Sequence, residues 1–265
     1  MTAAGRPPGA ASARVSGAAP VSRSIAALAA LELRLTARRG ENILATIIIP
    51  VAVLLFFAGT SVIPLATHPV DFLLPGSIAL GLIAAGLVNL GIATAYDRSY
   101  GVLKRLGGSP LPRWGLIVAK LLAVGVLELV QVVVLVAVAV LVLGWRPGPD
   151  WSPPLVVVAL VLGTAAFAGL GLLLAGTLRA EATLALANAL FLALLMLGGI
   201  ILPVDHLPDI LRQVAAFLPA TALSELLRIA LDSGNVAGSP VAPLGILAAW
   251  AVAATALAAR SFRWD

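Results

Sequence analysis

The residues able to carry chemistry are few, and they lie far apart in a strongly apolar chain. His68 and His206 are the only histidines, and neither has a second imidazole nearby; the chain contains no cysteine. A metal site of the usual His/Cys type and a thiolate nucleophile are therefore not expected. No Gly-x-x-x-x-Gly-Lys-Ser/Thr motif occurs, so no Walker-type nucleotide site is expected either. We predict that the chain is not an enzyme by itself and that it holds no cofactor.

Four polar side chains interrupt the long apolar runs. Glu128 is followed three residues later by Gln131 on the same helical face, while Asn89 and Asn188 lie in two other runs. Polar groups at membrane depth commonly line a substrate or ion path, although Glu128 fits an interhelical hydrogen bond equally well. These four residues are candidates for a translocation path. One acid is thin support for a proton relay.

The composition indicates the environment of these residues. Of the 265 residues, 61% are hydrophobic and 11% are charged, and the mean hydropathy is +1.08. A soluble domain has about a quarter of its residues charged, and without that shell it could not cover so much apolar surface. An ordinary soluble enzyme and a disordered protein are both excluded. The chain is predicted to be a polytopic membrane protein.

Six apolar runs are long enough to cross a hydrocarbon core of about 30 Å, which needs about 20 helical residues. They cover residues 43–63, 72–96, 116–144, 155–178, 184–202 and 240–259. The predicted fold class is therefore all-α, with six transmembrane helices. Prolines at 203, 208 and 219 rule out one straight helix between the last two runs. Short re-entrant or surface helices are expected there, on the outer side.

The residues before the first run have a different character. In residues 24–40, Leu28, Leu31 and Leu35 share one helical face and arginines crowd the end, as in a helix lying at a membrane interface. A cytosolic extension of the first membrane helix is the alternative. Residues 1–23 lack the branched and aromatic residues that offset ordering entropy, so we expect a disordered tail. The rest, 24–265, is expected to be one transmembrane domain.

Basic residues predict the orientation. Of the 17 Lys and Arg residues, 14 fall on the side that holds both termini. Cytoplasmic loops carry the excess of positive charge, so both termini and the loops at 97–113 and 179–183 are predicted to be cytoplasmic. No aromatic residues alternate with these charges as stacking platforms, so nucleic acid is not an expected partner and the lipid bilayer is. The Ala-, Gly- and Arg-rich composition suggests a bacterial cytoplasmic membrane.

The inward loop Asp97–Arg113 combines charge with a short helical pattern. Leu103 and Leu106 are apolar, Arg98, Lys104 and Arg105 are polar, and a Gly-Gly pair followed by proline ends the helix. A rigid amphipathic helix of this kind fits a groove on a cytosolic partner and transmits movement. A basic loop that serves topology alone explains the same pattern.

The run DRSYGVLKRLGGSPLPRWGLIVAKLLA, which starts at Asp97, resembles the signature loop of ABC-2 type transporter permeases. That loop has an acidic-Arg pair, then Gly, Leu, a basic residue, Arg-Leu and Ser/Thr-Pro. Residues 197–228 resemble the outer segment of the same family, and 24–40 its N-terminal elbow helix. Asp97 stands where the family more often has glutamate, and Val102 where threonine is common. The daunorubicin-resistance type of efflux permease is the most similar subgroup.

The resemblance implies the membrane subunit of an ATP-driven exporter that moves a hydrophobic drug-like or lipid-linked substrate out of the cytoplasm. It implies a separate ABC ATP-binding subunit, which would bind ATP and Mg, and a second permease copy, identical or similar. An ion-coupled secondary transporter using Glu128 and a non-transport membrane scaffold are the alternatives. The residues implied in coupling to the ATP-binding subunit are Asp97, Arg98, Gly101, Leu103, Lys104, Arg105, Leu106, Pro110 and Leu111.

Overall fold

The computed structural model describes residues 20–38, 40, 44–60, 68–107, 113–232 and 238–261. Every regular element in these ranges is a helix, which confirms the predicted all-α class. The predicted tail lies almost wholly outside the described residues.

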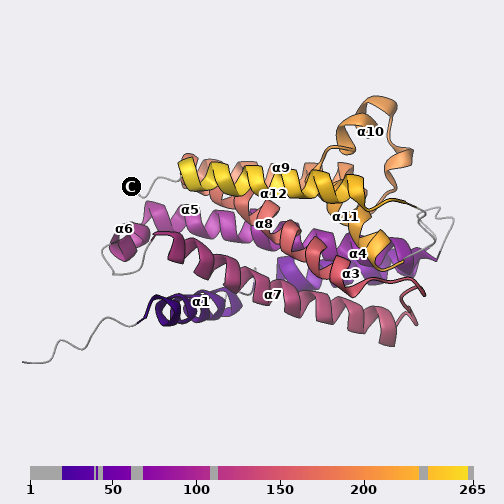
Figure 1. Ribbon diagram of the computed structural model, residues 1–265, viewed down its shortest axis with the longest axis horizontal. Helices are drawn as coiled ribbons and strands as arrows, with labels where there is room; N and C mark the ends of the chain where they lie inside the picture. The colour runs from indigo at the N-terminus through magenta and orange to yellow at the C-terminus, as the bar shows by residue number, and fades with distance from the viewer. Residues whose placement is uncertain are drawn as a thin grey trace, which may run out of the picture.

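Within the described ranges, five helices are long and apolar enough to cross a membrane, and they run along the long axis of the molecule (Figure 1). They correspond to the second through sixth predicted runs. The first is a continuous rod built from α4, a π-helical turn η2, and α5. The bounds are α4 Pro69–Ile83, η2 Ala84–Leu90, α5 Gly91–Ser99, α7 Arg113–Leu141, α8 Pro153–Thr177, α9 Ala180–Leu197 and α12 Val241–Ser261.

The first predicted run, 43–63, is described only in part. A π-helical turn η1, Leu44–Ile48, leads into α3, Ile49–Ala58, which packs against α4. The apolar helix Thr46–Ala58 is shorter than a full crossing. Residues 41–43 and 61–67 lie outside the described part of the chain, so a sixth crossing here stays a prediction.

The α4–η2–α5 rod occupies the centre of the bundle, and small residues let α8 pack closely against it. A Cβ added at Gly171 of α8 would lie 2.4 Å from the carbonyl oxygen of Gly86. One added at Gly91 would lie 3.0 Å from the Cα of Gly171. Such backbone contact is the usual role of glycine between membrane helices.

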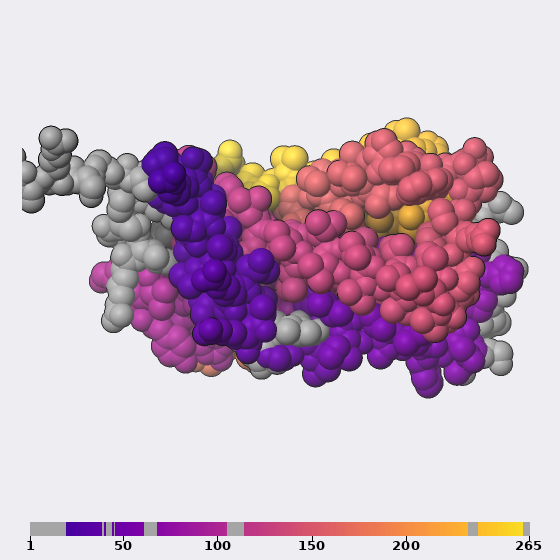
Figure 2. All heavy atoms as spheres, turned by 90° about the horizontal axis from the view of Figure 1, so that it is seen from below, coloured from indigo at the N-terminus to yellow at the C-terminus, as the bar shows by residue number. Residues whose placement is uncertain are grey.

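One end of the bundle carries the two helices that are expected to lie outside the hydrocarbon core. The amphipathic helix α1, Val21–Arg38, packs against α7 and crosses that end at a steep angle to the long helices (Figure 2). The short helix α6, Val102–Gly107, and the end of α12 lie at the same end (Figure 1). The helix α1 thus covers most of residues 24–40, and its position at a membrane interface stays a prediction.

The opposite end carries short helices, as the prolines predict. A 3₁₀ turn η3, Val204–His206, precedes α10, Asp209–Ala215, and α11, Pro219–Ala230. The axes of α10 and α11 are bent by 76°. The buried Arg228 of α11 donates to the Gly199 carbonyl oxygen and lies 3.9 Å from the centroid of the Phe72 ring. This side chain fixes α11 against the end of α9 and the start of α4.

Candidate functional site

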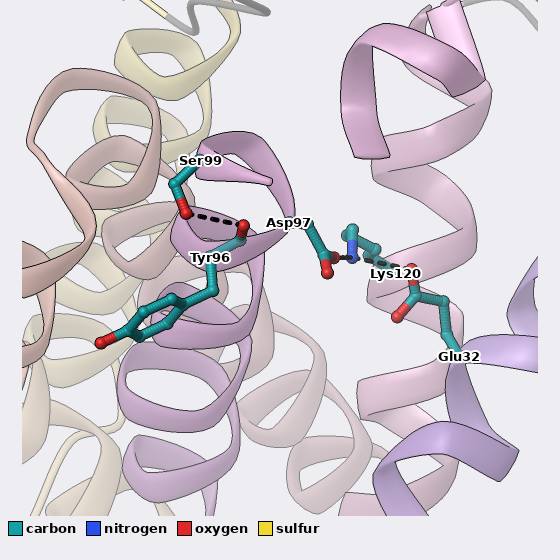
Figure 3. A network of polar contacts seen from close by, with 5 residues as sticks. All are labelled: Glu32, Tyr96, Asp97, Ser99 and Lys120. Atoms are coloured by element: carbon teal, nitrogen blue, oxygen red, sulfur yellow. Dashed lines mark hydrogen bonds and ion pairs between the residues drawn. The ribbon is translucent and has the colours of Figure 1, made fainter. Parts of the chain in front are cut away.

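A buried lysine joins three helices at the end of the bundle that carries α6. The ammonium Nζ of Lys120, on α7, lies 2.7 Å from Glu32 Oε1 of α1 and 3.0 Å from Asp97 Oδ2 of α5 (Figure 3). The Lys120 side chain is 1% exposed, and those of Glu32 and Asp97 are 19% and 27% exposed. We call these three residues the Lys120 cluster.

The Lys120 cluster is an electrostatic link. A buried ammonium is costly unless it is paired and hydrogen-bonded, and here two carboxylates accept from it. Two acids around one cation leave a net charge of one negative unit, which their partial exposure to water makes tolerable. Because Asp97 lies five residues before α6, the cluster ties the root of α6 to both α1 and α7.

From the sequence, Asp97 was predicted to couple to an ATP-binding subunit. The ion pair between Glu32 and Lys120 was not predicted. The signal was present, because a lysine within an apolar run commonly pairs with an acid inside the protein. The partner itself was not identifiable, since 88 residues separate Glu32 from Lys120.

The next residues of the predicted coupling segment also face the protein. Arg98 donates to the carbonyl oxygen of Leu178, the residue that follows the end of α8. Gly101 has φ of +70° and makes the sharp turn between α5 and α6, a backbone conformation that favours glycine. Leu103 is fully buried. Its side chain is therefore covered within the chain, whereas the sequence pattern predicted that it fills a groove on a partner.

The exposed surface of this segment consists of other side chains. Tyr100 is 73% exposed, and Val102 and Lys104 are exposed beside it. Of the remaining predicted coupling residues, Arg105 and Leu106 have their backbone in α6, but their side chains lie outside the described part. Pro110 and Leu111 lie outside the described residues altogether.

Two of the four candidate path residues are neighbours in the middle of the bundle. Glu128 is 4% exposed, and the Thr164 hydroxyl of α8 donates to its Oε2. Gln131 is fully buried, and its Nε2 donates to the carbonyl oxygens of Ser77 and Ile78 at 3.3 and 3.4 Å. These contacts connect α7 to α8 on one side and to α4 on the other.

The other two path residues lie elsewhere. Asn89 donates from Nδ2 to Thr46 Oγ1 at 2.8 Å, linking η2 to η1. Asn188 lies on the exposed surface of α9 and donates to the Leu184 carbonyl oxygen of its own helix at 2.8 Å. The structure therefore does not gather the four residues along one path.

Comparison with known proteins places these features in a family. A model of the ABC-2 type transporter family matches residues 23–231. This range includes nearly all of α1, the Lys120 cluster, α6 and α11, and it covers well over half of the chain.

Individual relatives are similar at lower coverage. YbhS of Escherichia coli K12, described as a probable multidrug ABC transporter permease, is 25% identical over 169 residues; these are 62% of this chain and 44% of YbhS. The chain thus matches less than half the length of that relative. Two proteins of Bacillus subtilis are also similar. The transport permease YvfS is 21% identical over 71% of this chain and 78% of YvfS. The linearmycin resistance permease protein LnrN is 32% identical over 45% of this chain and 31% of LnrN.

The family match, the all-helical fold and the five membrane-length helices agree with one another. The matched domain is the membrane permease, a multi-pass unit that does not itself contain the ATPase site. The chain belongs to the ABC-2 type transporter family.

Proposed function

We propose that this chain is the permease subunit of an ATP-driven exporter and that the end of the bundle carrying α6 receives force from a separate ATP-binding subunit. The observation that supports this most is the Lys120 cluster, which joins α1, α5 and α7 just before the start of α6. The exposed side chains of Val102 and Lys104 on α6 are accessible to a partner. Leu103 between them is buried, and Asp97 before them pairs with Lys120.

In this proposal the ATP-binding subunit contacts Tyr100, Val102 and Lys104. The segment 179–183, which was predicted to be a loop and contains the start of α9, lies close to that subunit. Closure of that subunit on ATP displaces α6. The buried Leu103 and the Asp97–Lys120 pair pass the displacement to α5 and α7, and Glu32 passes it to α1. A short helix that is fixed where it joins α5 transmits movement that a loose loop would absorb.

The arrangement in the membrane is part of the proposal. The start of α1, α6 and the end of α12 share one end of the bundle (Figure 1), and the basic residues favour the cytoplasm for that end. Both termini would then be cytoplasmic in a bacterial membrane, with residues 24–265 forming one transmembrane domain. Two permease copies would work with two ATP-binding subunits.

The proposed cargo is a hydrophobic drug-like or lipid-linked molecule, moved outward. The resemblance to daunorubicin-resistance permeases supports this, as do the multidrug and linearmycin-resistance names of two relatives. Transport would be tested with the chain and its ATP-binding subunit in inside-out proteoliposomes, using daunorubicin as the probe.

We expect ATP-driven uptake that falls at least several-fold when Tyr100→Ala is combined with Lys104→Glu. Phe217→Ala is the matched control, because Phe217 is 70% exposed at the opposite end of the bundle. Unchanged uptake in the Tyr100/Lys104 variant would contradict the proposed docking surface. Uptake by the purified chain alone under a proton gradient would favour a secondary transporter instead.

A further inference from the structure

A groove between α7 and α8 has the size of a small-molecule site. Its volume is about 500 Å³, within the range of about 300–1,000 Å³ that is usual for such sites. The two helices lie next to each other on the face seen in Figure 2. The lining is apolar except for one hydroxyl, and it includes Val118, Leu122, Gly125 and Leu129 of α7 and Val161 and Thr164 of α8. We call this the α7–α8 groove.

Glu128 lies next to this groove, behind the side chains that line it. It follows the lining residue Leu121 by two helical turns and Gly125 by one turn, so the three share a side of α7. Thr164, which lines the groove, is also the residue that donates to Glu128 Oε2. No atom lies within 4 Å of the position a Gly125 Cβ would take. The missing side chain leaves open space one helical turn from Glu128.

The carboxyl group has fewer partners than a buried acid needs. Its Oε1 is buried without a hydrogen-bond partner among the described residues. The Thr164 hydroxyl also lies 2.8 Å from the Leu160 carbonyl oxygen, and its single proton serves one acceptor at a time. In the described ranges the ion pairs of α7 involve Lys120 and not Glu128. A donor from outside the chain would complete this site.

A second groove on α7 provides a contrast. It has a similar volume, about 460 Å³, and is lined by Val132, Val133, Val136, Ala137, Val140 and Leu141. None of these side chains is polar, so a lipid chain satisfies that surface fully. The acid beside the α7–α8 groove calls for an occupant with a polar donor as well as an apolar body.

We propose that the α7–α8 groove binds a small amphipathic molecule with an apolar tail and a primary ammonium head. The ammonium donates to Glu128 Oε1 and the tail packs along Leu122, Leu129 and Val161. The choice of an ammonium follows from charge complementarity, because the acid lacks a cation within the described chain. As a statement about cargo this rests on the proposed exporter function, but the binding itself needs no partner subunit.

The test measures binding of radiolabelled dodecylamine by equilibrium dialysis to the chain in phosphatidylcholine nanodiscs, with empty nanodiscs subtracted. We expect saturable binding of one molecule per chain, at least about tenfold tighter than that of dodecanol, since a hydrogen bond to a charged group is the stronger kind. Glu128→Gln keeps the shape of the side chain. It should weaken dodecylamine binding by about tenfold and leave dodecanol binding unchanged.

Gly125→Leu fills the groove at a position where nothing opposes the new side chain, and it should abolish binding of both probes. Gly245→Leu is the matched control, because Gly245 of α12 is equally open, and it should bind both probes normally. Thermal midpoints of all variants verify folding.

Three results would overturn the proposal. The first is binding no greater than that of empty nanodiscs, which would mean that bilayer lipid is the occupant. The second is unchanged dodecylamine binding in Gly125→Leu. The third is absent binding together with a change of particle mass in Gly125→Leu, which would make the groove an interface with a second copy. The binding assay contains no ATP-binding subunit and so does not depend on the exporter function. If transport fails in the proteoliposome assay while dodecylamine binding is intact, the exporter function is refuted and the proposed binding site is not.

Discussion

Replacing Lys120 by methionine removes the cation from the Lys120 cluster while keeping an unbranched side chain of similar length. Glu32 and Asp97 then face each other without the ammonium that lay 2.7 and 3.0 Å from them. Removing one partner of a fully buried pair costs about 3–5 kcal/mol. Because the two acids are 19% and 27% exposed, water recovers part of this, and we expect a loss of about 2–3 kcal/mol.

The acids provide matched variants with a different expected result. Glu32→Gln or Asp97→Asn leaves Lys120 with one carboxylate, so the cluster becomes neutral and each change should cost about 1 kcal/mol or less. Combining both with Lys120→Met removes every charge. That triple variant should recover most of the stability lost by Lys120→Met, because neutral replacement of a buried ion cluster is often nearly free of cost.

The measurement is reversible unfolding of the purified chain in mixed micelles, followed by circular dichroism during titration with dodecyl sulfate. The order of the variants in unfolding stability shows whether Lys120 stabilises the protein by its charge or by packing. If Lys120→Met is no less stable than the single acid variants, or if the triple variant is no more stable than Lys120→Met, the electrostatic reasoning is wrong.

Three further substitutions have specific expected results in the same unfolding assay. Gly101→Ala should cost about 1 kcal/mol because φ is +70° there and nothing crowds the added methyl group; an unchanged midpoint would mean that the turn relaxes freely. Gly171→Ala should cost more than about 2 kcal/mol, since its Cβ would lie 2.4 Å from the Gly86 carbonyl oxygen, and a neutral result would refute the close packing of α8. Arg228→Met should expose the α10–α11 segment to protease by releasing the Gly199 carbonyl oxygen, whereas Arg212→Met, an exposed arginine of α10, should not.

Much of the fold was predictable because apolar length is a direct consequence of membrane thickness. Five of the six predicted runs coincide with membrane-length helices. Helix ends were less predictable, since apolar residues continue past them. The run predicted at 184–202 is the helix Ala180–Leu197, which stops where Gly198 and Gly199 turn the backbone, the latter with φ of +62°.

The candidate site was only partly predictable, because contacts between distant segments are not encoded in local pattern. The segment 97–107 was identified from its charges and turn residues. The sequence did not identify which of its side chains face inward. Periodicity over six residues does not distinguish a groove on a partner from a groove on the chain itself. Leu103 shows this, because it is apolar at the expected position and is fully buried within the chain.

The most direct test of the proposed coupling uses the absence of cysteine from the chain. A benzophenone-maleimide label is attached at Lys104→Cys on α6 or at Asp209→Cys on α10, at the opposite end of the bundle (Figure 1). The complex with the ATP-binding subunit is then illuminated. We predict cross-links to that subunit from position 104 and none from position 209. Cross-links from 209 and none from 104 would contradict the proposal that force enters through α6.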